Sequence, residues 1–298
     1  IVMAGAIDVH SHIAGTNVTL GRQLMPELPL IAASQGQPFG PSPAAWGAYA
    51  TGIRYAEMGY TTVIEPAMIP THAIEAQAEL AAIPIIDVAA LVILGNDDPR
   101  VHEETMLEAE QDDLLCYLHG RKAEYGPFPV YGYSCIPPSP FQLKDWERYD
   151  VSRFVDPGCV SPEEGRRTTG PDNRVIRNTT IEKELAELAG ADDLAEAICL
   201  FHCPPYNGKL DRAALDGRKV DHVPLDVHIG SIAVERFIDE RQPLLTLHGH
   251  VHESRTLTGH WRETRGRTHS LSAATEKPQL ALVRFDPHRP VNATIDLC

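Results

Sequence analysis

The first third of the chain alternates between apolar runs and stretches with helical spacing. Residues 4–12 (AGAIDVHSH) and 60–70 (YTTVIEPAMIP) are short β-rich runs, whereas residues 44–59 and 71–83 place apolar side chains on one face of a helix. Residues 84–99 (PIIDVAALVILGNDDP) predict one long or two short buried strands. Strands that alternate with helices predict an α/β fold with a mainly parallel sheet.

The middle of the chain has a different pattern. We expect a helix at 107–118, an irregular proline-rich segment at 125–141, and a mobile surface loop at 161–180. An acidic helix is predicted at 181–197.

Regular patterns return towards the C-terminus. Residues 198–207 (ICLFHCPPYN) predict a strand that runs into a turn, and 230–243 predict a helix. Strands are expected within 244–254 (LLTLHGHVHES) and 280–286 (LALVRFD).

The composition of the chain indicates which partners and which cellular location to expect. The 298 residues carry a formal net charge of −15, which disfavours partners such as long nucleic acids or anionic membranes. No apolar run is long enough to span a bilayer, and the six cysteines are scattered without a CxxC pair. We therefore expect a cytoplasmic protein; its oligomeric state is left open.

Potential metal ligands follow four of the predicted strands. They are Asp8 with His10, Asn96 with Asp97, His202, and His250 with His252. Residues i and i+2 of an extended segment point the same way, so the two spaced pairs could each face one site. Carboxylate, amide and imidazole ligands together suit Mn, Fe, Zn or Co. Each motif taken alone also has a structural explanation as a turn or a core histidine.

From about residue 91 to the C-terminus, the motifs LVILGNDDP, LFHCPPYNGKLD and HIGSIAVERFIDERQPLLTLHGHVHES resemble those of the calcineurin-like metallophosphoesterases. The resemblance implies an αββα sandwich with two divalent metal ions, which hydrolyses a small phosphoester with a metal-bound hydroxide. It implies that Asn96, His202 and His250 bind one metal and that His252 binds the other. Asp97 would lie beside the leaving group.

Two further histidines are candidates for the surroundings of this site. His228 and His248 could donate hydrogen bonds to ligands or phosphate from just outside the metal's own ligand set. An ordinary structural role is the alternative for both.

Residues 1–90 resemble another family. The motifs MAGAIDVHSHIAGTNVTLGRQLMPE and TGIRYAEMGYTTVIEPAMIPTHA are similar to the amidohydrolase subunit of formylmethanofuran dehydrogenase and of the related formyltransferase/hydrolase complex. In that family His10 and His12 would bind metal on the first strand of a distorted TIM barrel. The later strands of the barrel have no counterpart. The chain is therefore predicted to join two families near residue 90, and we expect the joined segments to pack as one domain.

The join affects the expected dinuclear site. Metallophosphoesterases normally have a GDxxD turn whose aspartate bridges the metals, and no such turn occurs between His12 and Asn96. Asp8 and His10 can supply the first ligand strand, and Glu65 is the candidate substitute for the bridging carboxylate. Three functions stay open: a metal-dependent phosphoesterase, a non-catalytic remnant that binds at most one metal, and amidohydrolase or formyl-group chemistry.

Overall fold

The computed structural model describes residues 6–8, 51, 60–64, 87–112, 115–277, 279 and 281–297. For the strands at 6–8, 60–64 and 87–89 it describes the backbone only. The chain divides into two compact units. The first comprises residues 1–92, 104–117 and 284–294, and the second comprises 93–103, 118–283 and 295–298.

The first unit contains a parallel sheet of consecutive strands, β1 (Ala6–Asp8), β2 (Tyr60–Ile64) and β3 (Asp87–Ala89). These strands lie in the β-rich runs predicted from the sequence. β4 (Leu91–Val92) pairs in parallel with β5 (Cys116–Tyr117). The predicted helices at 44–59 and 71–83 fall outside the described residues, apart from one helical position at residue 51.

The helix predicted at 107–118 is wrong in its limits. Helix α6 (Glu103–Gln111) buries Met106 and Ala109 and ends before the apolar residues that follow it. Cys116 and Tyr117 form strand β5 instead. So short an apolar run fits the residue spacing of a strand as well as that of a helix, so the sequence pattern does not distinguish the two.

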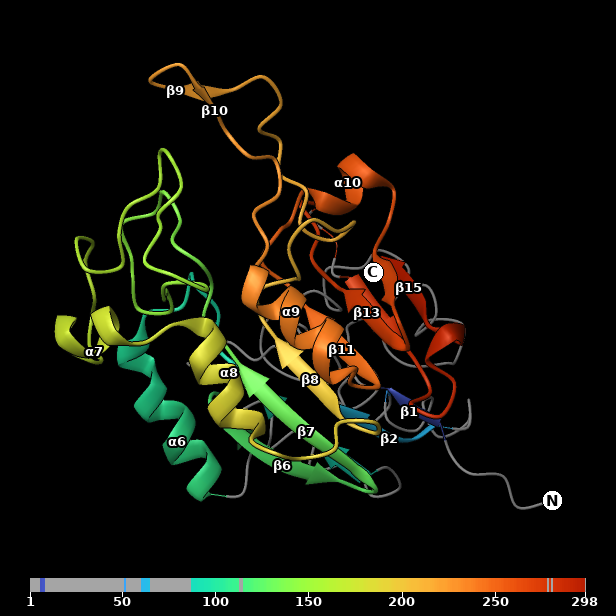
Figure 1. Ribbon diagram of the computed structural model, residues 1–298. Coiled ribbons are helices and arrows are strands. Elements are labelled where there is room, and N and C mark those ends of the chain that lie inside the picture. Colours follow the sequence, from blue (N-terminus) through green and yellow to red (C-terminus); the bar gives the residue numbers. More distant parts are fainter. Residues whose placement is uncertain are drawn as a thin grey trace, which may run out of the picture. The chain divides into compact units, whose positions relative to one another are not determined.

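The second unit is built on a six-stranded sheet with the order β12-β13-β11-β8-β7-β6 (Figure 1). Its four interior strands are mutually parallel, and each edge strand is antiparallel to its neighbour. The carboxyl ends of parallel strands meet at one edge of a sheet, where ligands usually bind. The strands are β6 (Arg121–Tyr125), β7 (Phe128–Tyr133), β8 (Ile198–Phe201), β11 (Leu245–His248), β12 (Arg262–Arg265) and β13 (Thr268–Ser272).

The prediction of irregular structure at 125–141 is wrong for its first part, which completes a β-hairpin. Phe128, Val130, Tyr131 and Tyr133 on β7 are each at most 2% exposed. Pro129 lacks an amide hydrogen, but it pairs with Glu124 next to the hairpin turn, where the ladder tolerates a missing bond. The burial of these aromatic side chains outweighs the proline.

Two helices pack beside the sheet. α8 (Ile181–Ala189) buries Ile181, Leu185 and Ala189 at helical spacing, and it contacts both β7 and α9 (Ile232–Arg241; Figure 1). The helix predicted at 181–197 is shorter than expected, because Gly190 adopts a φ of 49° and ends it.

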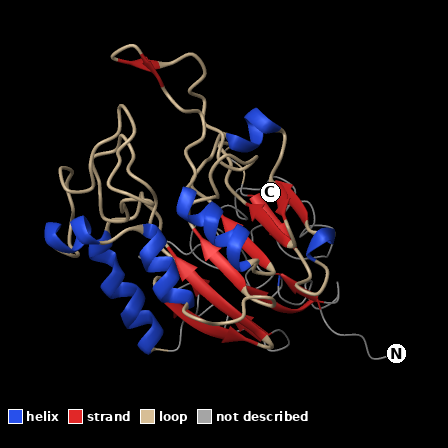
Figure 2. Ribbon diagram, viewed as in Figure 1, coloured by secondary structure: helices blue, strands red, loops and turns tan. Residues whose placement is uncertain are grey.

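Long loops separate these elements, especially between β7 and the short helix α7, as Figure 2 shows. Within the described residues, no helix combines the length and hydropathy needed to cross a bilayer. The remaining elements are η2 (Arg100–His102), α7 (Asn173–Asn178), β9 (Lys219–Val220), β10 (Val223–Pro224), α10 (Ser254–Thr258), β14 (Ala281–Arg284), η3 (Pro290–Asn292) and β15 (Thr294–Leu297).

A charged segment, residues 144–148 (KDWER), is unexpectedly buried, and none of its residues is more than 4% exposed. Lys144 Nζ lies 2.6 Å from Glu147 Oε2 and donates to the Ser139 carbonyl at 2.8 Å. Arg148 Nε lies 3.2 Å from Glu184 Oε1 on α8. Every charge in this segment therefore has a partner, as burial requires.

Asp145, in the same segment, corrects the prediction of a mobile loop at 161–180. Its buried carboxylate accepts hydrogen bonds from the amide and hydroxyl of Thr168 at 2.7 and 2.6 Å. Residues 173–178 form helix α7, capped by Asp172. Local polarity indicated surface exposure correctly, but this tertiary contact fixes the loop.

Asp150 should be a stronger helix cap than Asp172. Asp150 accepts from Ser231 Oγ and from the amides of Ile232 and Ala233 at the start of α9, whereas the exposed Asp172 caps only α7. We expect Asp150→Ala to lower the free energy of unfolding by about 2–3 kcal/mol and Asp172→Ala by about 1 kcal/mol. Urea denaturation measures both, and equal losses would contradict the prediction.

Candidate metal centre

Asn96 lies at the tip of a closed turn. The amide of Gly95 donates to Asp98 Oδ2 at 2.7 Å, and the amide of Asp98 donates to the Gly95 carbonyl at 3.1 Å. Asn96 is only 7% exposed, and its Nδ2 donates to Asp97 Oδ1 at 2.9 Å. That bond fixes the amide so that Oδ1 is available on the opposite side.

Residues 144–148, the charged segment, hold the Asn96 turn in place through hydrogen bonds. Trp146 Nε1 donates to the Asp98 carbonyl at 2.8 Å, and Asp145 Oδ2 accepts the Arg100 amide at 2.7 Å. The Arg100 guanidinium lies over the Trp146 ring, 4.7 Å from its centroid. The position of Asn96 therefore depends on residues about fifty positions away in the sequence.

His202 directly follows β8 at the carboxyl edge of the sheet. Its amide donates to the Tyr133 carbonyl, and its own carbonyl accepts the Gly249 amide, both at 3.0 Å. A Cβ on Gly95 would lie 2.6 Å from the His202 ring, so this position needs glycine. The backbone of the turn and the imidazole are thus in direct contact.

His250 has a strained backbone. Its φ is 63°, and the amide of Val251 donates to the Gly249 carbonyl at 2.8 Å, which closes a γ-turn around His250. A positive φ in this rare turn costs about 1–3 kcal/mol and is most often found at functional sites. From this turn, the His250 imidazole reaches hydrogen-bond distance of Asn96.

The three side chains converge on one atom. Asn96 Oδ1 lies 2.8 Å from His202 Nε2 and 2.9 Å from His250 Nδ1. The two imidazole centroids are 5.3 Å apart. Without a cation, the ring nitrogens can donate to Oδ1. A metal would require each nitrogen to present its lone pair instead.

Burial keeps both imidazoles neutral at physiological pH. Burial, with a smaller contribution from the neighbouring His252, lowers the pKa of His250 to about 4. Burial also lowers the pKa of His202 well below its ordinary value, with contributions from the other histidines of the cluster. Neutral imidazoles and an amide oxygen form a donor set that fits a borderline divalent metal.

The other candidates in this unit lie around the three convergent residues. His252 and Asp97 are exposed. His248 bonds to backbone instead of to a ligand ring: its Nδ1 lies 3.1 Å from the Phe201 carbonyl and 3.0 Å from the Cys203 carbonyl. Its position fixes the backbone on both sides of His202.

Among the described residues, His228 shares no hydrogen bond with Asn96 or with another histidine. Its Nδ1 lies 2.8 Å from Asp211 Oδ1. His228 therefore takes no part in the hydrogen bonds that orient Asn96, His202 and His250.

The N-terminal candidates cannot be added to this geometry. Only the backbone of Asp8 is described, in β1, and His10, His12 and Glu65 lie outside the described residues. In the part of the chain that is described, no three His, Cys, Asp or Glu side chains form a metal-binding group. The convergent set includes the amide of Asn96 in addition to two histidines.

Sequence reasoning missed the supports of this centre. The run at 144–148 is four-fifths charged and predicts a solvated surface, yet Asp145 and Trp146 hold the Asn96 turn. The GN and GH dipeptides at 95–96 and 249–250 were the available signal for close backbone approach.

No family model matches the chain. Two curated proteins are similar over 99 residues, one third of this chain. One is a subunit of the formyltransferase/hydrolase complex Fhc of Methylorubrum extorquens, at 48% identity, and the other is protein FwdA of Methanocaldococcus jannaschii, at 44%. The chain spans about a fifth (18%) of their length. The predicted resemblance of the N-terminal segment to these proteins is confirmed.

The fold has a solved counterpart in the crystal structure of TT1561 of Thermus thermophilus. The similarity covers 99% of both chains with a TM-score of 0.50 and 14% sequence identity. At this identity the similarity concerns the fold alone. The chain has the predicted mixed α/β fold of the metallophosphoesterase type.

The two glycines beside His202 should respond differently to a methyl group. At Gly95 the new Cβ would lie 2.6 Å from the ring, whereas at Gly249 it would lie at an ordinary 3.4 Å. We expect Gly95→Ala to weaken Co²⁺ binding about 10- to 100-fold and Gly249→Ala to change it little. Titration followed by cobalt absorption tests this, and equal effects would refute the geometry.

Acid should destabilise the protein through His248. Burial lowers the pKa of His248 from 6.5 to about 4, so between these values the unfolded chain binds more protons than the folded one. Its contribution to stability is complete above about pH 6.5 and falls by about 3 kcal/mol as the pH approaches 4. Urea denaturation across this range should show a shallower pH dependence for His248→Asn, which cannot gain that proton; identical slopes would contradict the assignment.

Proposed function

We propose that the protein is a metal-dependent hydrolase of small phosphoesters. The observation that carries this proposal is the convergence of His202 Nε2 and His250 Nδ1 on Asn96 Oδ1, within 2.8 and 2.9 Å. These atoms come from three loops, at the ends of β8 and β11 and in the Asn96 turn. The strained backbone of His250 supports a binding role over simple packing.

Asn96, His202 and His250 would hold one divalent ion of the Mn, Fe, Zn or Co type. A bound ion of this kind polarises phosphoryl oxygens and lowers the pKa of water. His252, exposed two residues after His250, is the candidate ligand for a second ion. Asp8, His10 and Glu65 complete the proposed dinuclear set, with His10 and His12 as the alternative pair.

The residues around the ions have distinct roles in this proposal. Asp97 accepts a hydrogen bond from the Asn96 amide and so directs Oδ1 towards the two histidines. His248 holds the backbone on either side of His202. These contacts orient ligands in advance, which lowers the cost of binding a metal.

Charge favours a small substrate. The net charge of −15 repels polyanions, while divalent ions reverse the field locally. A small phosphoester can therefore bind at the centre, whereas long nucleic acids and membrane surfaces are disfavoured as partners. A cytoplasmic location is part of the same proposal.

Two alternatives follow from particular observations. The described residues bring together candidate ligands for one ion, which is compatible with a remnant that binds one metal without catalysis. The similarity of the N-terminal segment to the formyltransferase/hydrolase protein favours amidohydrolase or formyl-group chemistry instead. In the phosphoesterase proposal, that segment contributes ligands but not its relatives' reaction.

Metal content separates the first alternative from the proposal. After Mn²⁺ loading and desalting, we expect nearly two ions per wild-type chain by elemental analysis, a loss of at least one in His250→Ala, and no loss in His222→Ala. His222 is an exposed histidine that shares no hydrogen bond with the centre. Turnover of bis(p-nitrophenyl) phosphate should follow the metal content.

One ion per wild-type chain without turnover would favour the remnant. Hydrolysis of N-formyl substrates in place of phosphoesters would favour the chemistry of the N-terminal segment. Unchanged metal content in His250→Ala would refute the proposed ligand set.

A further inference from the structure

One histidine outside the metal centre is oriented by a fully buried carboxylate. Asp211, 0% exposed, accepts the amides of Asn207 and Gly208 at 2.8 and 2.9 Å, and its Oδ1 lies 2.8 Å from His228 Nδ1. A carboxylate accepts, so Nδ1 carries a proton. Nε2 has no hydrogen-bond partner among the described residues, and the His228 side chain is 24% exposed.

Two neighbours fix the ring further. The His228 amide donates to Asp226 Oδ1 at 2.9 Å, and the Tyr206 hydroxyl donates to Asp226 Oδ2 at 2.6 Å. The Tyr206 and His228 rings meet edge to face with centroids 6.0 Å apart. His228 therefore has a defined orientation, with one accessible ring nitrogen.

The loop that carries His228 is fastened to both ligand-bearing strand ends. Near His202, the Ser231 amide donates to the Pro204 carbonyl at 2.9 Å. Near His252, the Arg212 amide donates to Ser254 Oγ at 3.2 Å, and Arg212 forms a β-bridge with His228. The loop of His228 is thus hydrogen-bonded to residues two positions after His202 and two positions after His252.

The groups of the proposed centre already have other roles. Asn96, His202 and His250 would bind the metal, His252 is the candidate ligand for a second ion, and Asp97 Oδ1 accepts a hydrogen bond from the Asn96 amide. An alkoxide leaves a phosphoester slowly unless it is protonated. An imidazole held by a carboxylate can provide that proton, because the carboxylate stabilises the imidazolium.

We propose that His228 Nε2 protonates the leaving oxygen of the phosphoester and that Asp211 is its positioning residue. This inference rests on the proposed phosphoesterase function. A water oxygen forms a bond to phosphorus as the bond from phosphorus to the leaving oxygen breaks. The leaving oxygen takes the Nε2 proton, and the proton lost by the attacking water restores the imidazolium through solvent.

The first test needs neither metal nor turnover. Free neutral histidine favours a proton on Nε2, whereas the bond to Asp211 requires the neutral ring to carry it on Nδ1. In ¹⁵N-histidine NMR spectra of the metal-free protein, we expect an Nδ1–H signal that disappears in His228→Asn. An Nε2–H tautomer for His228 would overturn the proposal.

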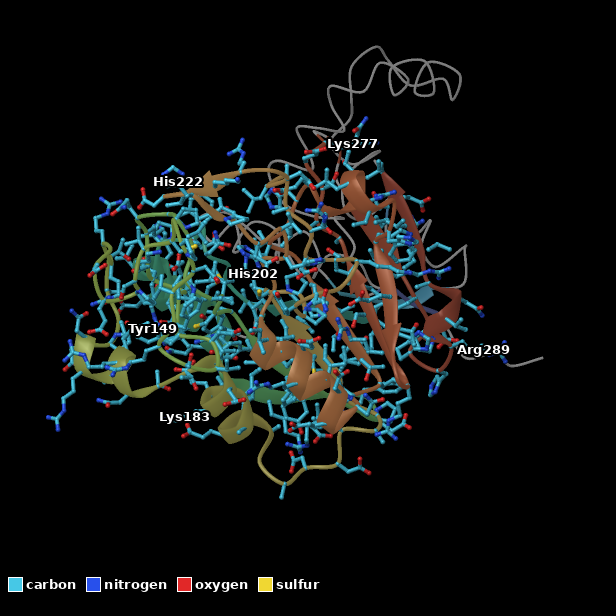
Figure 3. All side chains as sticks on the ribbon, turned by 45° about the horizontal axis from the view of Figure 1, so that its top comes forward. Tyr149, Lys183, His202, His222, Lys277 and Arg289 are labelled. Atoms are coloured by element: carbon cyan, nitrogen blue, oxygen red, sulfur yellow. The ribbon has the colours of Figure 1, made fainter. Side chains whose placement is uncertain are left out.

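The second test uses the acidity of the leaving group. His228→Asn keeps an amide donor for Asp211 but removes Nε2. We expect kcat/KM of the Mn²⁺-loaded variant to fall about 100-fold for diphenyl phosphate but less than about 10-fold for bis(p-nitrophenyl) phosphate, whose better leaving group needs less protonation. The matched control is His222→Asn, which should retain both rates. His222 is an exposed residue in the turn between β9 and β10, and it lies near the periphery in Figure 3.

The outcomes separate the two proposals. Equal losses on both esters, with the wild type active, would overturn the role of His228 alone. If the metal-loaded wild type hydrolyses neither ester, the phosphoesterase function fails and the proposed proton donor fails with it.

Discussion

The burial of charged residues 144–148 is the constraint on which the second unit depends. A buried ion costs several kcal/mol unless partners surround it, so each charge in this segment determines where another segment must lie. Asp145 accepts hydrogen bonds from the amide of Arg100, which follows the Asn96 turn, and from the amide of Thr168. Arg148 forms an ion pair with Glu184 on α8. Apolar substitutes could fill the same volume but could not specify these connections.

This constraint extends to the candidate centre. Asp145 and Trp146 hold the turn that presents Asn96, while the parallel strands β8 and β11 place His202 and His250 at the same edge. The γ-turn at His250 is tolerated because its neighbours in the sheet are well paired. Strain, burial and neutral imidazoles together describe a site organised before any ligand arrives.

Two kinds of similarity differ in their extent. The sequence similarity to the Fhc subunit and to protein FwdA covers one third of the chain, whereas the similarity to TT1561 covers 99% of it and concerns the fold alone. The convergent residues lie in the second unit. Chemistry follows from a site rather than from a fold. The geometry of Asn96, His202 and His250 therefore carries the functional proposal, and the N-terminal similarity supplies its main competitor.

The sequence alone determined the local features: the strand patterns at 60–64 and 245–248, helix α9, and the positions of the histidines next to strand ends. Those features depend on periodicity and on turn residues, which are local. Tertiary structure decided the rest. It buried the KDWER segment, converted the aromatic run at 128–133 into an interior strand, and paired His228 with the buried Asp211. These outcomes depend on which distant partner satisfies a charge or covers an aromatic ring, and a one-dimensional pattern does not contain that information.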